Sequence, residues 1–214
     1  MSNASLLTLS TRQLGTWPGL RAEVLFVMPC TDLPMARRAA TLMIERAGAA
    51  LTVLIVEDLD GWGFVRITNR VFQATQGRCF GYVAQDAFAG RQWLALALAA
   101  LQAPGKHLFA FNDGKWHGVI ASFGLARRDW AVRNYPQGEF FHAAYQQHFA
   151  DVELSLLALA CAGHCHDARS VLVEVDWNKD HAPVNAGDRA LYHSRLATGM
   201  DGRVRSAELL KLVA

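Results

Sequence analysis

Two uninterrupted apolar runs on either side of a helix-like segment constrain this fold more than any other feature of the sequence. The runs are "AEVLFVM", residues 22–28, and "LTVLIVED", residues 51–58. Neither alternates between apolar and polar residues, as expected of strands that are buried on both faces. Between them, small and apolar residues recur at helical spacing from Pro34 to Ala47, and Gly48 suits the end of that helix. The pattern predicts two parallel strands joined by a right-handed helical crossover.

The segments that follow extend this unit into a larger sheet. Residues 64–77 are expected to form a helix that ends at Gly77, residues 79–84 a third strand, and residues 87–102 an Ala- and Leu-rich helix. "HLFAF" and "WHGVIASF" flank the turn-like "NDGK", which predicts an antiparallel hairpin. Further helices are expected over 125–134, 139–149 and 151–163, then a strand over 170–177, a polar loop and terminal helices. The first twenty residues carry Gly and Pro and indicate a loosely structured lead-in.

Together these elements predict one α/β domain over residues 1–214. Its sheet should be mixed and mainly parallel, with helices on both faces and one antiparallel hairpin. The length of 214 residues and the apolar fraction of 52% suit a single sizeable core.

The composition argues against several classes of protein. A net charge of +2, with Lys and Arg scattered along the chain, gives no reason to expect a nucleic-acid partner. The longest apolar runs, such as "WLALALAALQ", reach half of the roughly 20 residues that cross a bilayer, so we expect no integral membrane segment. No signal-peptide pattern is evident, and a cytoplasmic protein is the default expectation. The sequence leaves the oligomeric state open, a homo-oligomer included.

The four cysteines do not suggest a disulfide framework, and we expect Cys30, Cys79, Cys161 and Cys165 to remain reduced. Two of them belong to "CAGHCHD", residues 161–167, where two thiols and two imidazoles are close in sequence. Their spacing lacks the second distant pair that is typical of a zinc site, so the segment is either a polar helix end or an incomplete metal motif.

Acidic residues follow the predicted parallel strands where each strand ends. In sheets of this kind ligands bind beyond the carboxyl ends of the strands. That rule brings residues 29–32, residues 57–60 and Asp86 into one crevice, independently of any family.

With this arrangement, residues 24–163 resemble a family 2-type glycosyltransferase of the GT-A fold, and residues 164–214 would add a strand, a loop and helices. Four segments carry the resemblance: "VMPCTDLP", "IVEDLDG", "TNRVFQATQGRCFGYVAQDA" and "ADVELSLLALACAG". They are similar to the first-strand motif, the acidic end of the second strand, the Asn-containing helix that leads to the Asp-x-Asp motif, and the Glu-Asp segment before a helix. Their order and separations match the family as well.

The resemblance implies a role for each matched residue. Pro29, Cys30 and Thr31 would line a nucleotide-sugar pocket, most simply for a UDP-sugar, with Glu57 or Asp58 at the base and Asn69, or its neighbours Arg66 and Arg70, near the same nucleotide. Asp86 would hold Mn²⁺ or Mg²⁺ on the diphosphate, since such ions prefer carboxylate and phosphate oxygens. Asp151 would be the general base of an inverting transfer to an unknown acceptor hydroxyl. His181 is a further candidate metal ligand, suggested only by its place in the loop after the last strand.

The sequence departs from the family at three of these positions. Ala84 replaces the first carboxylate of the Asp-x-Asp motif, Ala150 replaces the Glu beside the base, and Thr68 stands where an Arg is expected. An inactive GT-A-like binding or scaffold protein is therefore the alternative function, and a zinc-stabilised α/β module is a third.

Several candidates also have ordinary structural explanations. Asp86 and Asp151 each precede or begin a predicted helix, where Asp is a preferred cap. Asp113 in "NDGK" fits a turn better than an acid catalyst. Trp93, Trp116 and Trp130 are expected in the core or the wall of a cleft, and one of them could stack on a sugar.

Overall fold

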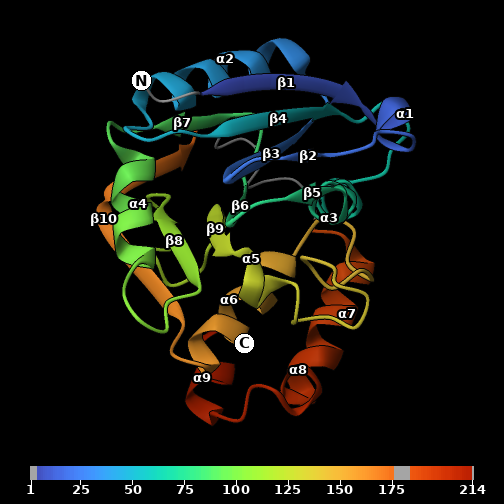
Figure 1. Cartoon of the computed structure of the whole chain (residues 1–214). Helices are drawn as coiled ribbons and strands as arrows, with labels where there is room; N and C mark the ends of the chain where they lie inside the picture. Colours follow the sequence, from blue (N-terminus) through green and yellow to red (C-terminus); the bar gives the residue numbers. More distant parts are fainter. Residues whose placement is uncertain (1–3, 176–183, 214) are drawn as a thin grey trace.

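The computed structural model describes residues 4–175 and 184–213. Within this part of the chain, eight strands form one curved sheet in the order β1-β4-β3-β6-β9-β8-β10-β7 (Figure 1). The strands are β1 (Ser5–Ser10), β3 (Val24–Cys30), β4 (Thr52–Glu57), β6 (Cys79–Tyr82), β7 (Ala87–Ala89), β8 (Leu108–Asn112), β9 (Gly124–Arg127) and β10 (His164–Glu174). A second, two-stranded sheet pairs β2 (Leu20–Arg21) with β5 (Thr75–Gln76).

The first four strands in the spatial order are parallel, and the direction changes at β9. Strand β9 runs antiparallel to both of its neighbours, β6 and β8. Strand β10 is parallel to β8 and antiparallel to the short edge strand β7. The mixed, mainly parallel sheet that the sequence predicts is therefore confirmed, and the ends of β3, β4, β6 and β8 point to the same edge.

Helices cover both faces of this sheet, as Figure 1 shows for α2 on one side and α6 on the other. They are α1 (Thr11–Leu14), α2 (Leu33–Arg46), α3 (Phe64–Ala74), α4 (Trp93–Leu101), α5 (Arg128–Ala131), α6 (Ala150–Ala160), α7 (Ala186–Ala197), α8 (Gly199–Gly202) and α9 (Ala207–Leu212). No helix in the described residues is long and apolar enough to cross a membrane.

Alternation along β3 divides the core in two. Leu25 and Val27 pack with α3 and α6, whereas Phe26 and Met28 pack with α2 and α4. All four side chains are fully buried. A strand with two apolar faces needs helices on both sides, which explains the unbroken apolar run in the sequence.

The parallel unit agrees with the sequence interpretation, and individual residues explain where its helices begin and end. Helix α2 begins with Asp32, whose carboxylate accepts the Met35 N–H at 2.9 Å, and Pro34 occupies its first turn. Helix α3 ends three residues before Gly77, where the chain passes so close to the Ala22 carbonyl that a Cβ would lie 1.7 Å from its oxygen. Only glycine fits there.

Two predictions for the beginning and middle of the chain are wrong. The lead-in is not loose, because Ser5–Ser10 pair in parallel with β4 as an edge strand. This strand is largely exposed on both faces, so it lacks the apolar pattern by which a buried strand is recognised. The helix predicted over 87–102 starts only at Trp93, since residues 87–89 pair with β10 instead.

The hairpin prediction is correct in direction and wrong in extent. Strands β8 and β9 are antiparallel, but β9 begins at Gly124 rather than near Trp116, which leaves residues 113–123 as a loop. β9 also occupies the first part of the helix predicted over 125–134, which is reduced to the single turn of α5. The last strand begins earlier than predicted, at His164.

The helix predicted over 139–149 does not form. Side chains from neighbouring elements accept backbone N–H groups of this segment instead. Asn69 of α3 accepts those of Phe140 and Phe141, and Asp188 of α7 accepts those of residues 146–148. A buried segment with its N–H groups satisfied in this way needs no regular structure.

Candidate functional site

The edge where β3, β4 and β6 end gathers most of the predicted donor-site residues. Cys30 and Glu57 are opposite each other in the β3–β4 register, and the Asp58 N–H donates to the Cys30 carbonyl at 2.8 Å. Gln85 Oε1 accepts the N–H groups of both Thr31 and Asp32, at 2.8 and 2.9 Å. This amide joins the Asp-x-Asp-like segment to the end of the first buried strand, as the topology predicts.

Two of the acidic side chains at this edge accept hydrogen bonds from backbone N–H groups. The carboxylate of Asp58 accepts the N–H groups of Trp62 and Gly63, at 2.9 and 2.8 Å, and Asp32 caps α2. Burial, followed by the charges of Glu57, Asp32 and Asp58, raises the pKa of the Cys30 thiol to about 11. The thiol is therefore protonated near neutral pH and is not a nucleophile.

Asp86 is buried and does not cap a helix. The strand β7 follows it directly, and α4 begins after Gln92, so the capping prediction is wrong. Asp86 lines a hollow of about 480 Å³ together with Gln85 and residues of α2, among them Arg38.

A second hollow, of about 320 Å³, brings Asp151 and the end of β6 together. Ala84, at the position of the missing motif carboxylate, lines it with Asp151. Its wall also includes Asp113, Lys115 and Trp116 from the β8–β9 loop. We call this hollow the Asp151 pocket. Asp86 and Asp151 thus face different hollows on the two sides of the same strand end.

Asp151 lies in the first turn of α6 but is not its cap. Phe149, in the left-handed conformation with φ 67°, precedes the helix at the cap position. Burial raises the pKa of Asp151 to about 6, and the charge of Asp113 adds to this, although the backbone N–H groups of Val152 and of Asp151 itself oppose the shift. A carboxylate with a pKa near neutrality is well matched to accept a proton.

Asp113 is the turn residue that the sequence predicts, and it is also part of the pocket. One of its oxygens accepts the N–H groups of Lys115 and Trp116, at 2.9 and 2.8 Å. The other accepts the Ser122 hydroxyl. The residues after β8 thereby reach the same edge as those after β3, β4 and β6.

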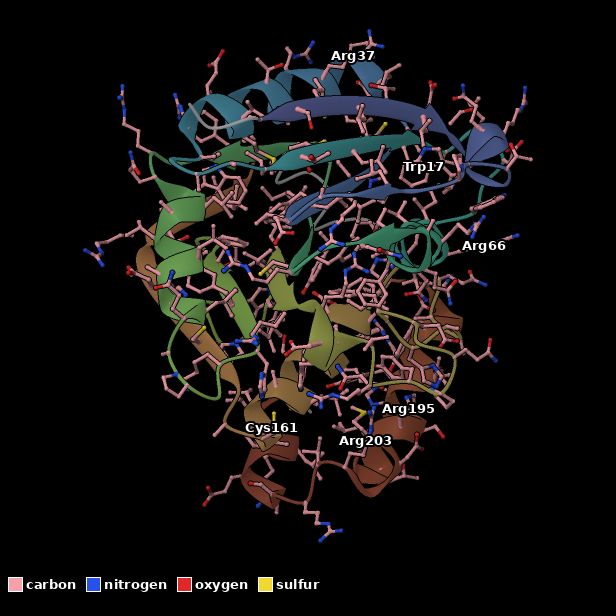
Figure 2. All side chains as sticks on the ribbon, in the orientation of Figure 1. Trp17, Arg37, Arg66, Cys161, Arg195 and Arg203 are labelled. Atoms are coloured by element: carbon pink, nitrogen blue, oxygen red, sulfur yellow. The ribbon has the colours of Figure 1, made fainter. Side chains whose placement is uncertain are left out.

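Asn69, Arg66 and Arg70 lie apart from this edge, around a hollow of about 870 Å³ between α3 and the 137–147 segment. Both polar ends of the Asn69 amide contact the backbone of Phe140 and Phe141. Arg66 points outward (Figure 2), with its guanidinium 4.2 Å from the centroid of the Trp62 ring. Thr68, where the family has an Arg, is fully buried.

The described residues contain no group of three or more His, Cys, Asp or Glu side chains placed to hold a metal ion. This includes residues 161–167, so the zinc alternative has no support: α6 ends at Ala160 and β10 begins at His164. Burial lowers the pKa of His164 to about 4, and its neighbour His166 contacts the Ala110 carbonyl through Nδ1 at 2.9 Å. His181 lies outside the described residues.

Sequence reasoning missed Lys115 as a pocket residue, did not single out Trp116 among the three tryptophans expected in the core or a cleft wall, and missed His148. The first two follow β8, which is parallel to β3, β4 and β6. The rule that ligands bind beyond the carboxyl ends of parallel strands would have indicated them if the direction of β8 had been predicted. His148 had no usable signal, because its place depends on the irregular segment that Asp188 holds.

No protein-family model and no curated protein sequence matches this chain significantly. Solved structures do match its fold. A mannosyltransferase from Pyrobaculum calidifontis, PcManGT, in complex with GDP-Man and Mn²⁺, superposes with a TM-score of 0.55 at 12% identity, over 90% of this chain and 79% of that one. TarS of S. aureus gives 0.54 at 9% identity, over 85% of this chain and 41% of TarS.

This chain has a GT-A-like glycosyltransferase fold. The fold expected from the four sequence motifs is therefore confirmed. At these sequence identities the similarity shows the fold alone. The reaction that this GT-A-like chain could catalyse has to be inferred from its own residues.

Proposed function

We propose that this protein is a glycosyltransferase that moves a sugar from a nucleotide-sugar donor to an acceptor hydroxyl. The observation that carries the proposal concerns Asp151. Its partly buried carboxylate lines the wall of a pocket beside the end of β6, and its pKa is raised to about 6. The GT-A-like fold supports it, and so does the GDP-Man bound by the mannosyltransferase that shares this fold.

In the proposed reaction Asp151 acts as general base. Its carboxylate takes the proton of the acceptor hydroxyl while that oxygen forms a bond to the anomeric carbon of the donor sugar. The bond from the anomeric carbon to the diphosphate oxygen breaks on the opposite side, and the diphosphate leaves with the electron pair. Attack and departure on opposite faces invert the anomeric centre.

The donor nucleotide is proposed to bind at the edge formed by residues 29–31 and 57–58. Pro29, Cys30 and Thr31 end the first buried strand there, and Asp58 fixes the turn at Trp62 and Gly63. A UDP-sugar is our first choice of donor, and Asn69 with its two neighbouring arginines stays a prediction for the same ligand.

The proposal includes no divalent cation held by the protein alone. Asp86 is the one carboxylate that the motif retains, and the described residues do not fit a metal centre held by the protein alone. The proposed proton transfer and bond cleavage involve no metal, and Mn²⁺ is varied in the test below.

The test is thermal stabilisation of the protein by UDP, GDP and their sugar conjugates, with and without Mn²⁺. A ligand at a hundred times its Kd adds about 2.7 kcal/mol, or roughly 5–10 °C for a chain of this size. We expect one nucleotide to reach this range and Asp86→Ala to lose any Mn²⁺-dependent part of it. Asp129→Ala, at an exposed acid beyond the other edge of the sheet, is the matched control. No shift with any nucleotide would favour the alternative, an inactive GT-A-like binding or scaffold protein.

A further inference from the structure

One tryptophan is placed differently from the others that the structure describes. Trp93 is fully buried and Trp130 nearly so, at 7% exposure. Trp17 and Trp62 are half-buried, one against the core and one beneath Arg66. Trp116 is 47% exposed and lines the Asp151 pocket.

The Trp116 ring lies on a loop that is fixed in place. Asp113 accepts the Trp116 N–H, and the Trp116 carbonyl accepts the Val119 N–H at 2.9 Å. His117 and Gly118 both have positive φ, of 48° and 77°. Gly118 packs so closely on the His166 ring that a Cβ would lie 2.1 Å from it.

This arrangement holds an apolar ring at a polar pocket without burying it. A non-glycine residue such as His117 in a left-handed conformation costs of order 1 kcal/mol and persists where the surroundings impose it. Because the backbone that carries the ring is already fixed, less freedom is lost when a ligand covers the ring, which favours binding. The geometry therefore suits a ligand that offers one flat apolar face and polar groups at its rim.

Charge narrows the class of ligand. Among the residues that the structure describes, the pocket wall carries three carboxylates, those of Asp113, Asp151 and Glu174, and one lysine, Lys115. An anionic ligand would be repelled by the excess of acid, whereas hydroxyl groups can donate to carboxylates. A sugar ring meets both conditions, because its axial C–H groups form an apolar face and its hydroxyls surround it.

We propose that Trp116 is the platform for the acceptor and that the acceptor is an uncharged carbohydrate. One sugar ring stacks on the indole, and a hydroxyl of the ring is directed to the Asp151 carboxylate across the pocket. Trp116 is then a specificity-determining residue, while proton transfer belongs to Asp151. This inference rests on the proposed function for its chemistry but can be tested by binding alone.

The test uses protein labelled with 5-fluorotryptophan and observed by fluorine NMR. The chain has six tryptophans, and Trp116→Phe assigns the resonance of interest by its loss. Neutral oligomers of glucose, mannose, galactose and N-acetylglucosamine are titrated, with an oligogalacturonate of the same length as the anionic counterpart. We expect the Trp116 resonance to shift with at least one neutral oligomer, to stay unchanged with the anionic one, and the Trp62 resonance to remain in place throughout.

Variants then separate the ring from the rest of the site. Trp116→Ala should weaken carbohydrate binding about tenfold or more, since aromatic stacking and the buried area are lost. Trp116→Phe should retain binding within about threefold, because a smaller flat ring remains. The KM for the acceptor should rise in Trp116→Ala, whereas hydrolysis of the donor without acceptor and stabilisation by nucleotide should not change.

Each contrary outcome has a distinct meaning. If nucleotides stabilise the protein and no neutral oligosaccharide shifts the Trp116 resonance, the acceptor assignment is overturned and the glycosyltransferase proposal survives. Loss of nucleotide stabilisation in Trp116→Ala would instead place the ring at the donor. A change of oligomeric state in this variant, measured by light scattering, would identify the ring as a protein contact and also overturn the assignment.

Discussion

Asp151 and Glu153 stand two residues apart on α6, yet they lie in regions of opposite character. Glu153 is fully buried, and both of its oxygens are bound by Arg195, at 2.6 and 2.7 Å. The hydroxyls of Tyr135 and Tyr145 donate to the same two oxygens at 3.0 Å. Figure 2 shows Arg195 and Arg203 close together on this side of the molecule, and Arg203 lies 3.7 Å from Glu153.

On the side of α6 that faces the Asp151 pocket, the carboxylate charge is not compensated. Asp151 has neighbouring negative charge in Asp113 and no ion pair among the described residues, and its pKa rises to about 6. The comparison teaches that burial alone does not define a functional acid. A buried carboxylate with its charge fully compensated stabilises the fold, whereas one that lacks compensation is available to exchange a proton.

The largest expected effect is on transfer rate, in Asp151→Asn. This change keeps the shape of the side chain and removes its ability to accept a proton. We expect kcat to fall by about 10²–10⁴-fold, the usual contribution of a general base, with nucleotide stabilisation unchanged. Nucleotide release from the donor in the presence of acceptor measures it, and wild-type activity should decline below pH about 6 as Asp151 is protonated.

Glu153→Gln is the counterpart on the other side of α6. Removing one member of a buried ion pair costs about 3–5 kcal/mol, because Arg195 would keep a poorly compensated charge. For a chain of this size the midpoint of thermal unfolding should fall by roughly 6–20 °C. Glu208→Gln, on the exposed face of α9, is the control and should change it little. A stable Glu153→Gln protein that has lost only transfer activity would reverse the roles assigned to the two acids.

The contrast between these regions also explains what the sequence could predict. The parallel unit from β3 to β6 follows from local patterns, since unbroken apolar runs, Asp32 and Gly77 each act within a few residues. Its strand ends therefore predicted the edge that brings Cys30, Glu57 and Asp86 into one part of the molecule.

The segment from 132 to 149 was not predictable in this way. Its conformation depends on two acceptors that are distant in sequence, Asn69 and Asp188, and on Glu153 of the helix that follows it. Apolar and aromatic residues there fit a helical pattern, but tertiary hydrogen bonds take the place of helical ones. This segment forms part of the wall around Asp151. The sequence motif could therefore suggest Asp151 as a general base, but it could not predict the residues that surround it.

A smaller effect is expected on the stability of Asp151→Asn, and its sign is opposite to that of Glu153→Gln. The pKa of Asp151 is raised from an unfolded value of about 3.9, so the folded state binds more protons between the two values and stability falls as pH rises through about 6. Above pH 7 the ionised side chain costs the folded state about 3 kcal/mol. Asp151→Asn should therefore unfold at a higher temperature than wild type at pH 7.5 and at the same temperature at pH 4. An equal midpoint at both pH values would mean that the charge is compensated after all.

The smallest expected effect separates the contribution of the two tyrosine hydroxyls from that of Arg195 in compensating the charge of Glu153. Tyr135→Phe removes one hydroxyl donor to Glu153 and keeps the ring over which the Arg203 guanidinium lies at 5.2 Å. Because Arg195 still binds both carboxylate oxygens, we expect a loss of only about 1 kcal/mol, or roughly 2–4 °C in the midpoint of thermal unfolding. Tyr145→Phe should behave alike, since its hydroxyl is placed equivalently on the other oxygen. If either change destabilised the protein as much as Glu153→Gln, the hydroxyls rather than the arginine would be the main compensation for the buried charge.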